Sequence, residues 1–245
     1  MKKIITIITL GLMIMACGKQ ESIKKIGITQ IVEHPALDGA RNGFLKALED
    51  AGYKDGENLK IEYQNAQGDQ AVAQSIAESF VSDSKDLILA IATPTAQAAY
   101  NATKEIPVLI TAVTDPIQAG LAKSLEKSET NVTGTSDATP IDKQFALIRE
   151  LLPESKKVGI VYNTSELNSE VQVAQAKVIA QKYGLELVIK GVTSVNDLAQ
   201  VLDSLLKEVD VLYTPTDNLI VSATPLVVKK AMENKIPLIG CIEDQ

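Results

Sequence analysis

The second half of the chain repeats the first, and this repeat restricts the possible folds more than any other feature. The segment KKIGI at 24–28 returns as KKVGI at 156–160, and Gly52 returns as Gly184, so that both offsets are 132 residues. A repeat of this length is too long for a solenoid and suits two copies of one α/β lobe. Two similar lobes form a cleft between them, which is a common place for a small molecule to bind.

The order of apolar runs and helical patterns within each copy indicates the fold class. Residues 26–31 form a nearly continuous apolar run, typical of a buried parallel strand, and 36–51 have helical spacing that Gly52 ends. Strands and helices alternate in this way along the chain. We therefore expect an α/β protein of two similar lobes, each a parallel sheet flanked by helices, with a cleft between them. The N-terminal lobe is predicted at 24–135 and the C-terminal lobe at 136–245.

The first residues have the pattern of an export signal. A positive start, MKK, precedes an apolar run at 4–16 that is too short to span a membrane as a helix, and Cys17 follows. The end of the run resembles a bacterial lipobox, in which the cysteine is lipidated. We expect a lipoprotein signal peptide at 1–16, lipidation of Cys17 and a tether at 17–23, so that the protein is extracytoplasmic and anchored to the cell membrane by lipid. A plain secretory signal with an incidental cysteine is the alternative.

Composition argues against several classes of function. The formal net charge is −7, and removal of residues 1–16 takes away two lysines and no acid, which leaves −9. This acidity argues against nucleic acid as a partner, because nucleic-acid binding needs a basic surface. With two cysteines and one histidine in the sequence, neither a disulfide framework nor a zinc site is expected. No metal and no cofactor are predicted.

Polar loops follow the predicted strands, and most of them come directly before a helix. Ligands of parallel sheets bind beyond the carboxyl ends of the strands, so these loops form the predicted site. A helix start presents free N–H groups to a carboxylate, as we expect near 93–95, and Asp217 is the expected partner of a ligand ammonium group. The predicted ligand-binding residues are His34, Thr93, Pro94, Thr95, Thr114, Asp115, Tyr162, Asn163, Ser165, Glu166, Asp217 and Asn218.

Several of these residues also have a structural interpretation. The Thr-Pro pairs at 93–94 and 214–215 suit helix starts, with threonine as N-cap and proline as the first helical residue. Capping alone explains each pair singly, whereas their matching places in two lobes favour ligand binding. One helix is expected at 219–234. Tyr162 is equally well interpreted as a buried anchor. The single histidine, His34, is open to a cleft-lining, a structural or a catalytic role, although no nucleophile or metal set accompanies it.

The polar loops also carry a family resemblance. The segments are QIVEHPALD at 30–38, ATPTAQ at 92–97, TAVTDP at 111–116, GIVYNTSE at 159–166 with NS at 168–169, and PTDN at 215–218. They resemble a family of bacterial ABC-transporter substrate-binding lipoproteins of the tryptophan/tyrosine transport type, and the resemblance covers nearly all of 24–242. It implies a periplasmic-binding-protein type I fold that delivers a small solute to a membrane permease. The family is associated with aromatic amino acids.

The end of the sequence departs from this family. Family members continue past the point equivalent to Cys241 and return to the first lobe, whereas this chain stops at Gln245. We therefore expect a C-terminally truncated chain whose N-terminal lobe lacks its returning segment.

A solute-binding lipoprotein, acting as a monomer with an ABC permease and carrying an aromatic or other apolar amino acid, is the leading functional prediction. A ligand-sensing module that presents its bound ligand to a receptor is the alternative that the sequence leaves open. An enzyme is not expected. Two-lobed racemases need a cysteine from each lobe, and only Cys241 remains after the lipidated Cys17. A transcription regulator of this fold would need a basic helix-turn-helix, and export excludes that role.

Overall fold

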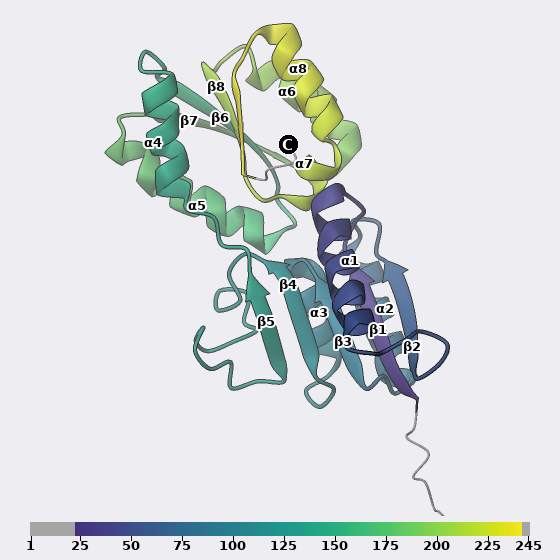
Figure 1. Ribbon diagram of the computed structural model, residues 1–245. Helices are drawn as coiled ribbons and strands as arrows, with labels where there is room; N and C mark the ends of the chain where they lie inside the picture. Colours follow the sequence, from purple (N-terminus) through teal and green to yellow (C-terminus); the bar gives the residue numbers. More distant parts are fainter. Residues whose placement is uncertain (1–22, 242–245) are drawn as a thin grey trace, which may run out of the picture.

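Two parallel β-sheets, one in each half of the chain, organise the molecule. The computed structural model describes residues 23–241, and Figure 1 shows the two halves stacked end to end. The first sheet has the strand order β2-β1-β3-β4-β5 and the second has the order β7-β6-β8-β9. Every pairing between neighbouring strands is parallel. The predicted α/β class, with two lobes of parallel sheet flanked by helices, is confirmed.

Strands and helices alternate along most of the described chain. The first half contains β1 (Lys24–Gln30), α1 (Pro35–Asp50), β2 (Leu59–Asn65), α2 (Gln70–Ser82), β3 (Leu87–Ile91), α3 (Thr93–Ala102), β4 (Val108–Val113) and β5 (Val132–Ser136). The second half contains α4 (Ile141–Leu151), β6 (Lys157–Asn163), α5 (Leu167–Lys182), β7 (Glu186–Val192), α6 (Val195–Leu205), β8 (Val211–Thr214), α7 (Asn218–Ser222), α8 (Thr224–Asn234) and β9 (Leu238–Gly240).

Helices cover both faces of each sheet, so the strands are buried on both sides. In the first lobe α1 contacts β3 and β4 from one face, while α2 and α3 pack together on the other (Figure 1). In the second lobe α4 packs with α5, and α6 packs with α8. The second sheet accordingly separates two cores, one around Phe145 and Tyr213 and one around Leu198 and Leu202. This double burial explains the continuous apolar runs of the strands.

The glycines of the sequence repeat have the same structural role in both lobes. A Cβ atom at Gly27 in β1 would lie 2.5 Å from the ring of Phe80 in α2, and one at Gly159 in β6 would lie 3.1 Å from Val209. Phe80 of α2 therefore leaves no room for a side chain at Gly27, and a side chain at Gly159 would crowd Val209 and Leu205 of α6. Gly52 and Gly184 follow α1 and α5 with φ angles of 87° and 61°, in the region that favours glycine.

The start of α3 differs from the prediction by one residue. Ala92, with a φ angle of 83°, is the N-cap, and Thr93 is already the first helical residue. The N–H of Ala92 still donates to the Thr111 carbonyl at 3.0 Å. Because β3 turns into α3 without an intervening loop, the helix begins earlier than the Thr-Pro pattern predicts.

The second predicted Thr-Pro helix start is wrong. Thr214 is the last residue of β8, and Asp217 is the N-cap of α7, where its carboxylate accepts the N–H of Ile220 at 2.9 Å. The single helix expected at 219–234 is divided at Ala223 into α7 and α8. Pro225 lies in the first turn of α8 and has no N–H to continue the preceding helix, which explains the break.

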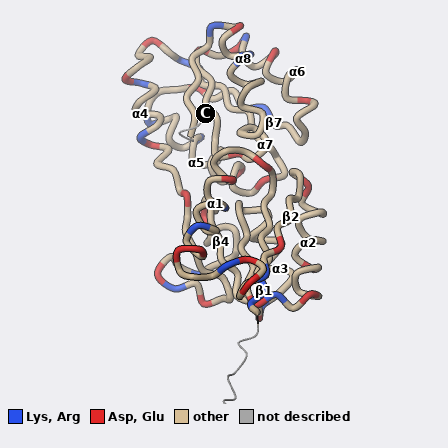
Figure 2. The backbone as a smooth tube through the Cα atoms, turned by 45° about the vertical axis from the view of Figure 1, so that its right-hand side comes forward, with Lys and Arg blue, Asp and Glu red and all other residues tan. Residues whose placement is uncertain are grey.

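The chain crosses from the first sheet to the second between Ser136 and Ile141. The predicted lobe boundary between residues 135 and 136 stays a prediction. The predicted signal peptide, Cys17 and nearly all of the tether lie outside the described residues, as do 242–245. Within 23–241, none of the helices combines the length and the apolar character needed to cross a bilayer. Basic and acidic residues are interspersed along both lobes (Figure 2).

Candidate ligand-binding site

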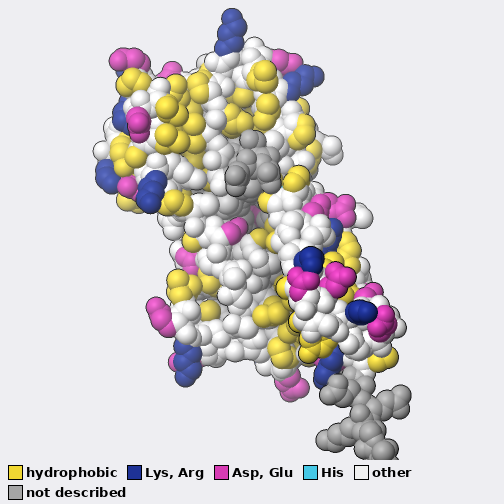
Figure 3. All heavy atoms as spheres, in the orientation of Figure 1, with side chains coloured by type: hydrophobic (Ala, Val, Ile, Leu, Met, Phe, Trp, Pro, Cys, Tyr) yellow, Lys and Arg dark blue, Asp and Glu magenta, His cyan; other side chains and the backbone are white. Residues whose placement is uncertain are grey.

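A cavity of about 380 Å³ lies between the two lobes. This volume is within the range typical of small-molecule sites, about 300–1,000 Å³. The space-filling view shows a hollow at the waist between the lobes, with acidic side chains visible in it (Figure 3). The cavity is lined by His34, Ala36, Leu37, Ala40, Thr111, Ala112, Thr114, Asp137, Thr139, Asn168, Thr216, Asp217, Asn218, Val221 and Cys241.

The two walls of this cavity differ in chemistry. The first-lobe wall comes largely from α1 and the end of β4 and includes the apolar side chains of Leu37, Ala40 and Ala112. The second-lobe wall comes from the start of α5 and the segment between β8 and α7, and it includes Asn168 and Asp217. A ligand with an apolar body and a polar head would meet a complementary surface on each side.

The carboxamide of Asn168, a residue that lines the cavity, has a fixed orientation. Its Nδ2 donates to the Thr216 carbonyl at 2.9 Å and to Glu166 Oε2 at 3.1 Å. Both partners are acceptors, so the nitrogen must face them and the oxygen must face away. Asn168 is only 4% exposed, and its Oδ1 has no hydrogen-bond partner within 23–241. A buried acceptor without a partner is costly, which marks this oxygen as a place for a donor from a ligand.

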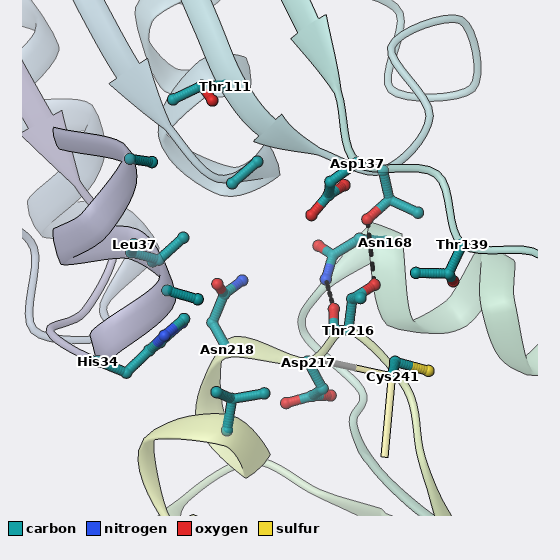
Figure 4. A pocket seen from close by; sticks show the side chains of 15 residues that line it. His34, Leu37, Thr111, Asp137, Thr139, Asn168, Thr216, Asp217, Asn218 and Cys241 are labelled. Carbon is teal, nitrogen blue, oxygen red and sulfur yellow. Dashed lines mark hydrogen bonds between the residues drawn. The ribbon is translucent and has the colours of Figure 1, made fainter. Parts of the chain in front are cut away.

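The carboxylate of Asp137 points toward this Asn168 oxygen (Figure 4). Asp137 follows β5, on the segment that crosses between the lobes, and it forms no ion pair with any residue of the described chain. The residue is exposed through the cleft. Partial desolvation of the carboxylate by the protein around it raises the pKa of Asp137, and a hydrogen bond from the Thr114 hydroxyl opposes the rise. A cationic donor bound here would stabilise the ionised form.

Asp217 lines the cavity and also connects several segments of the second lobe by hydrogen bonds. Its Oδ2 accepts the N–H of Asn163 at 2.6 Å and the hydroxyl of Ser169 at 2.7 Å, while Oδ1 accepts the N–H of Ile220 at 2.9 Å. The side chain is fully buried. Burial raises the pKa of Asp217, the neighbouring Glu166 carboxylate adds to the rise, and the three donors oppose it. The carboxylate therefore joins the end of β6 to the starts of α5 and α7.

Glu166 connects the same segments through amide groups. Its Oε1 accepts from Asn163 Nδ2 at 3.1 Å, and its Oε2 accepts from Asn168 Nδ2 and from both the backbone and the side-chain amide of Asn218. These four bonds hold Asn168 in the orientation described above. Glu166 thus positions a cavity residue without lining the cavity itself.

A second cavity, of about 510 Å³, lies on the other side of this network. Asn218 lines both cavities, whereas Asn163, Ser165 and Glu166 line only the second. The second-lobe network of Glu166, Asn168 and Asn218 therefore forms part of the partition between them. Seven of the twelve predicted site residues lie at one cavity or the other; His34, Thr114, Asp217 and Asn218 line the first.

The other five predicted residues do not line either cavity. Residues 93–95 are buried at the start of α3, where the Thr95 hydroxyl donates to backbone carbonyls. The Asp115 carboxylate accepts the N–H groups of Ile117 and Gln118 in the turn after β4. Tyr162 packs against a core of the second lobe, which agrees with its interpretation as a buried anchor. The binding role of these residues stays a prediction.

Polar contacts join the two lobes beside the cavities. The hydroxyl groups of Thr114 and Thr216 lie 3.3 Å apart across the cleft. Gln70, at the start of α2, donates its side-chain N–H to the carbonyl of Ser165. The cleft is therefore bridged on both sides of the partition.

The sequence prediction missed the two oxygen acceptors that face each other. Asp137 follows a strand that ends in the crossing segment, and a carboxylate on a crossing between lobes is a signal that could have identified it. Asn168 lies in a segment that carries the family resemblance, but the direction of its oxygen also depends on the Thr216 carbonyl, which is distant in the sequence. The apolar wall of α1, with Leu37, was not among the predicted site residues.

Comparison with known proteins identifies the family. The family model for ABC transporter substrate binding proteins matches residues 25–245. The chain belongs to this family. Its members are solute-binding proteins rather than enzymes, and their type I periplasmic-binding fold agrees with the two parallel sheets.

Individual relatives are similar over most of the chain. A tyrosine-binding protein of Clostridioides difficile is 59% identical over 220 residues, which are 90% of this chain and 64% of that protein. The chain thus spans less than two thirds of that relative. The crystal structure of an ABC domain from Streptococcus pneumoniae in complex with L-Trp matches with a TM-score of 0.86 at 40% identity, over 91% of this chain and 75% of that one.

A third relative allows the arrangement of the lobes to be compared. The ligand-free, open structure of a substrate binding protein with adhesive properties from Clostridium difficile is 58% identical, yet its TM-score is 0.61, over 89% of this chain and 74% of that one. The L-Trp complex is less similar in sequence but matches better. Since lobe folds follow sequence identity, the difference indicates another arrangement of the lobes. The lobes of the present structure are therefore arranged differently from those of that open structure, and polar contacts join them.

Proposed function

We propose that the chain is the extracytoplasmic solute-binding part of an ABC transporter and that it binds an aromatic amino acid in the interlobe cavity. The observation that carries the proposal is that the Asp137 carboxylate, which forms no ion pair within the described chain, faces Asn168 Oδ1, which has no hydrogen-bond partner there, opposite an apolar wall. An ammonium group has three N–H donors and a positive charge, so it suits this pair.

The cavity also offers a donor for the ligand's carboxylate. The Thr111 hydroxyl accepts from Thr135 at 3.2 Å. Thr111 therefore keeps its own proton to donate to a ligand. The apolar side chain of the ligand would then lie along α1, against Leu37 and Ala40. This assignment replaces Asp217 by Asp137 as the ammonium partner, because hydrogen bonds within the second lobe already hold both Asp217 oxygens.

Closure of the two lobes around the ligand is part of this proposal. Acceptors for the ammonium group come from the crossing segment and the second lobe, whereas the apolar wall belongs to the first lobe. A bound amino acid therefore gains contacts in the closed arrangement that the open one lacks, which shifts the population toward closure. The names of the relatives, a tyrosine-binding protein and an L-Trp complex, support an aromatic ligand.

The remaining parts of the proposal concern place and partners. We infer that Cys17 carries a lipid anchor, that the protein acts as a monomer and that a membrane permease receives its ligand. The lipobox-like sequence and the family support these inferences.

A carried ligand can be detected directly. The chain contains no tryptophan, so indole emission from purified and then denatured protein would come from a bound ligand. Mass spectrometry of the released material identifies other amino acids. Calorimetric titration with L-tyrosine, L-tryptophan and L-phenylalanine, beside L-glutamate and L-arginine, then tests the class. We expect binding of the aromatic amino acids only. Binding of none of the aromatic amino acids would contradict the proposal.

A further inference from the structure

The only histidine of the chain lies at the first-lobe side of the ligand cavity. His34 is the N-cap residue of α1, but its side chain makes no capping hydrogen bond. The residue is 5% exposed. The imidazole ring is therefore enclosed by the protein but does not cap the helix.

Neither ring nitrogen of His34 has a hydrogen-bond partner of normal geometry within the described chain. The side chain of Asn218 is near enough to raise the pKa of His34, and so is the charge of Asp38, but burial outweighs both and lowers it. The ring is therefore neutral near pH 7, with one N–H donor and one acceptor nitrogen. Two unused polar atoms in a buried ring are costly unless a ligand meets them.

The position of the ring fits the outer end of a ligand. In Figure 4 His34 and Leu37 approach the cavity from α1, on the side opposite to Asp137 and Asn168. An amino acid whose ammonium group lies at Asp137 would direct its side chain toward His34. The ring also borders a neighbouring groove of about 270 Å³, which shares Ala36 and Val221 with the ligand cavity. His34 thus forms part of the wall at which the ligand's side chain would end.

We propose, on the basis of the amino-acid function proposed above, that His34 reads the outer end of the ligand's side chain and favours an aromatic ring that carries a hydroxyl group. A phenol hydroxyl both donates and accepts, so it can satisfy either nitrogen of a neutral imidazole. A ring without a polar group would leave both nitrogens unpaired in a closed cavity. A site built to hydrogen-bond a hydroxyl discriminates strongly against the analogue that lacks it.

L-tyrosine and L-phenylalanine are the matched ligands for the test, because they differ only in the hydroxyl group. Calorimetric titration of the purified wild-type chain should show at least tenfold tighter binding of L-tyrosine. His34→Phe keeps an aromatic ring of similar shape and should bring the ratio of the two affinities close to one. His34→Gln keeps a hydrogen-bonding side chain and should retain part of the preference. Each ratio is measured on one protein, so a general loss of stability does not affect it.

Magnetic resonance gives a second readout that needs no variant. Because the sequence contains one histidine, protein purified without a histidine tag has one imidazole signal pair. L-tyrosine should shift the ring ¹⁵N resonances in the way that a new hydrogen bond does, and L-phenylalanine should not. Equal affinity for the two amino acids with unchanged ring signals would overturn the role of His34 and leave the proposed function intact. Binding of neither amino acid would overturn both proposals.

Discussion

At the residue scale, the site depends on side-chain oxygen atoms that lack a hydrogen-bond partner or an ion pair within the described chain. Asn168 Nδ2 donates hydrogen bonds to Thr216 and Glu166, whereas Asn168 Oδ1 has no partner within the described chain. Asp137 keeps its carboxylate free of ion pairs with the rest of the described chain. Asp217, by contrast, has three donors from its own lobe. Two aspartates at one cavity thus have different roles, one for the ligand and one for the fold.

Asp137→Asn should weaken aromatic amino-acid binding by more than tenfold. A tenfold loss of affinity corresponds to about 1.4 kcal/mol, which the lost attraction between the carboxylate and the ammonium group would supply. Asp142→Asn is the matched control, since it removes the same charge from an exposed residue that pairs with Lys182 at 2.6 Å. Because burial raises the pKa of Asp137, wild-type affinity should begin to fall at a pH above the ordinary range for aspartate as the solution is acidified, and the variant should lack this step. Equal affinities of the two variants in a calorimetric titration would refute the assignment.

Asp217→Ala should destabilise the fold by at least about 2 kcal/mol, because each buried donor left without a partner costs about 1–3 kcal/mol. Three donors are affected. Asp210→Ala is the control, since Asp210 also accepts two backbone N–H groups but at an exposed site. Urea unfolding of both variants measures the difference. A smaller loss for Asp217→Ala than for Asp210→Ala would disprove the structural role.

The raised pKa of Asp217 also predicts the direction in which the stability of the fold changes with pH. The folded state holds this proton more tightly than the unfolded state, so the group favours folding at low pH and loses that contribution as the pH rises above the ordinary aspartate value toward neutrality. The stability advantage of wild type over Asp217→Ala should therefore be larger at pH 5 than at pH 8.

At the scale of elements, the sequence repeat predicted the strands and helices of both lobes because the same packing of helix on strand recurs in each lobe. Gly27 lies under Phe80 of α2, and Gly159 lies under Leu205 of α6 and the following Val209, so a small residue suits each place where a helix packs on its strand. The strand-end loops were predicted for the same reason, since parallel sheets place them at one edge. The break between α7 and α8 was missed, because a helical pattern continues across Pro225.

Gly27→Ala should destabilise the first lobe by about 1–3 kcal/mol, the usual cost of overpacking a core. The added methyl group would lie 2.5 Å from the ring of Phe80, which must move. Gly43→Ala on α1 is the matched control, because no atom lies within 4 Å of its added methyl group. It should stabilise the helix by about 0.5–1 kcal/mol. Thermal unfolding of the two variants should give shifts in opposite directions, and shifts in the same direction would contradict this packing.

At the scale of the whole molecule, the cavity exists only because two lobes close on each other. The apolar wall comes from one lobe, Asn168 from the other and Asp137 from the segment between them. The sequence predicted two lobes and a cleft, but not which polar atoms remain unpaired after closure. That outcome depends on contacts between distant segments, such as the hydrogen bonds from Asn168 to the Thr216 carbonyl and from Asn218 to Glu166.

The predicted lipid anchor, Cys17, lies outside the described residues and can be tested by labelling. Metabolic labelling with a fatty acid should mark the wild-type chain and not Cys17→Ala, because the thiol is the predicted site of the lipid. The wild-type protein should fractionate with membranes, and the variant should lose that association. Equal labelling of both proteins would show that Cys17 is not the anchor.

The central claim is that the interlobe cavity holds an amino acid by its ammonium group. Calorimetric titration with L-tyrosine and with 3-(4-hydroxyphenyl)propionate tests it most directly, since the second compound is tyrosine without its amino group. The wild-type chain should bind L-tyrosine more than tenfold more tightly than the analogue, and Asp137→Asn should lose most of that difference. Equal affinity of the wild-type chain for the two compounds would contradict the account.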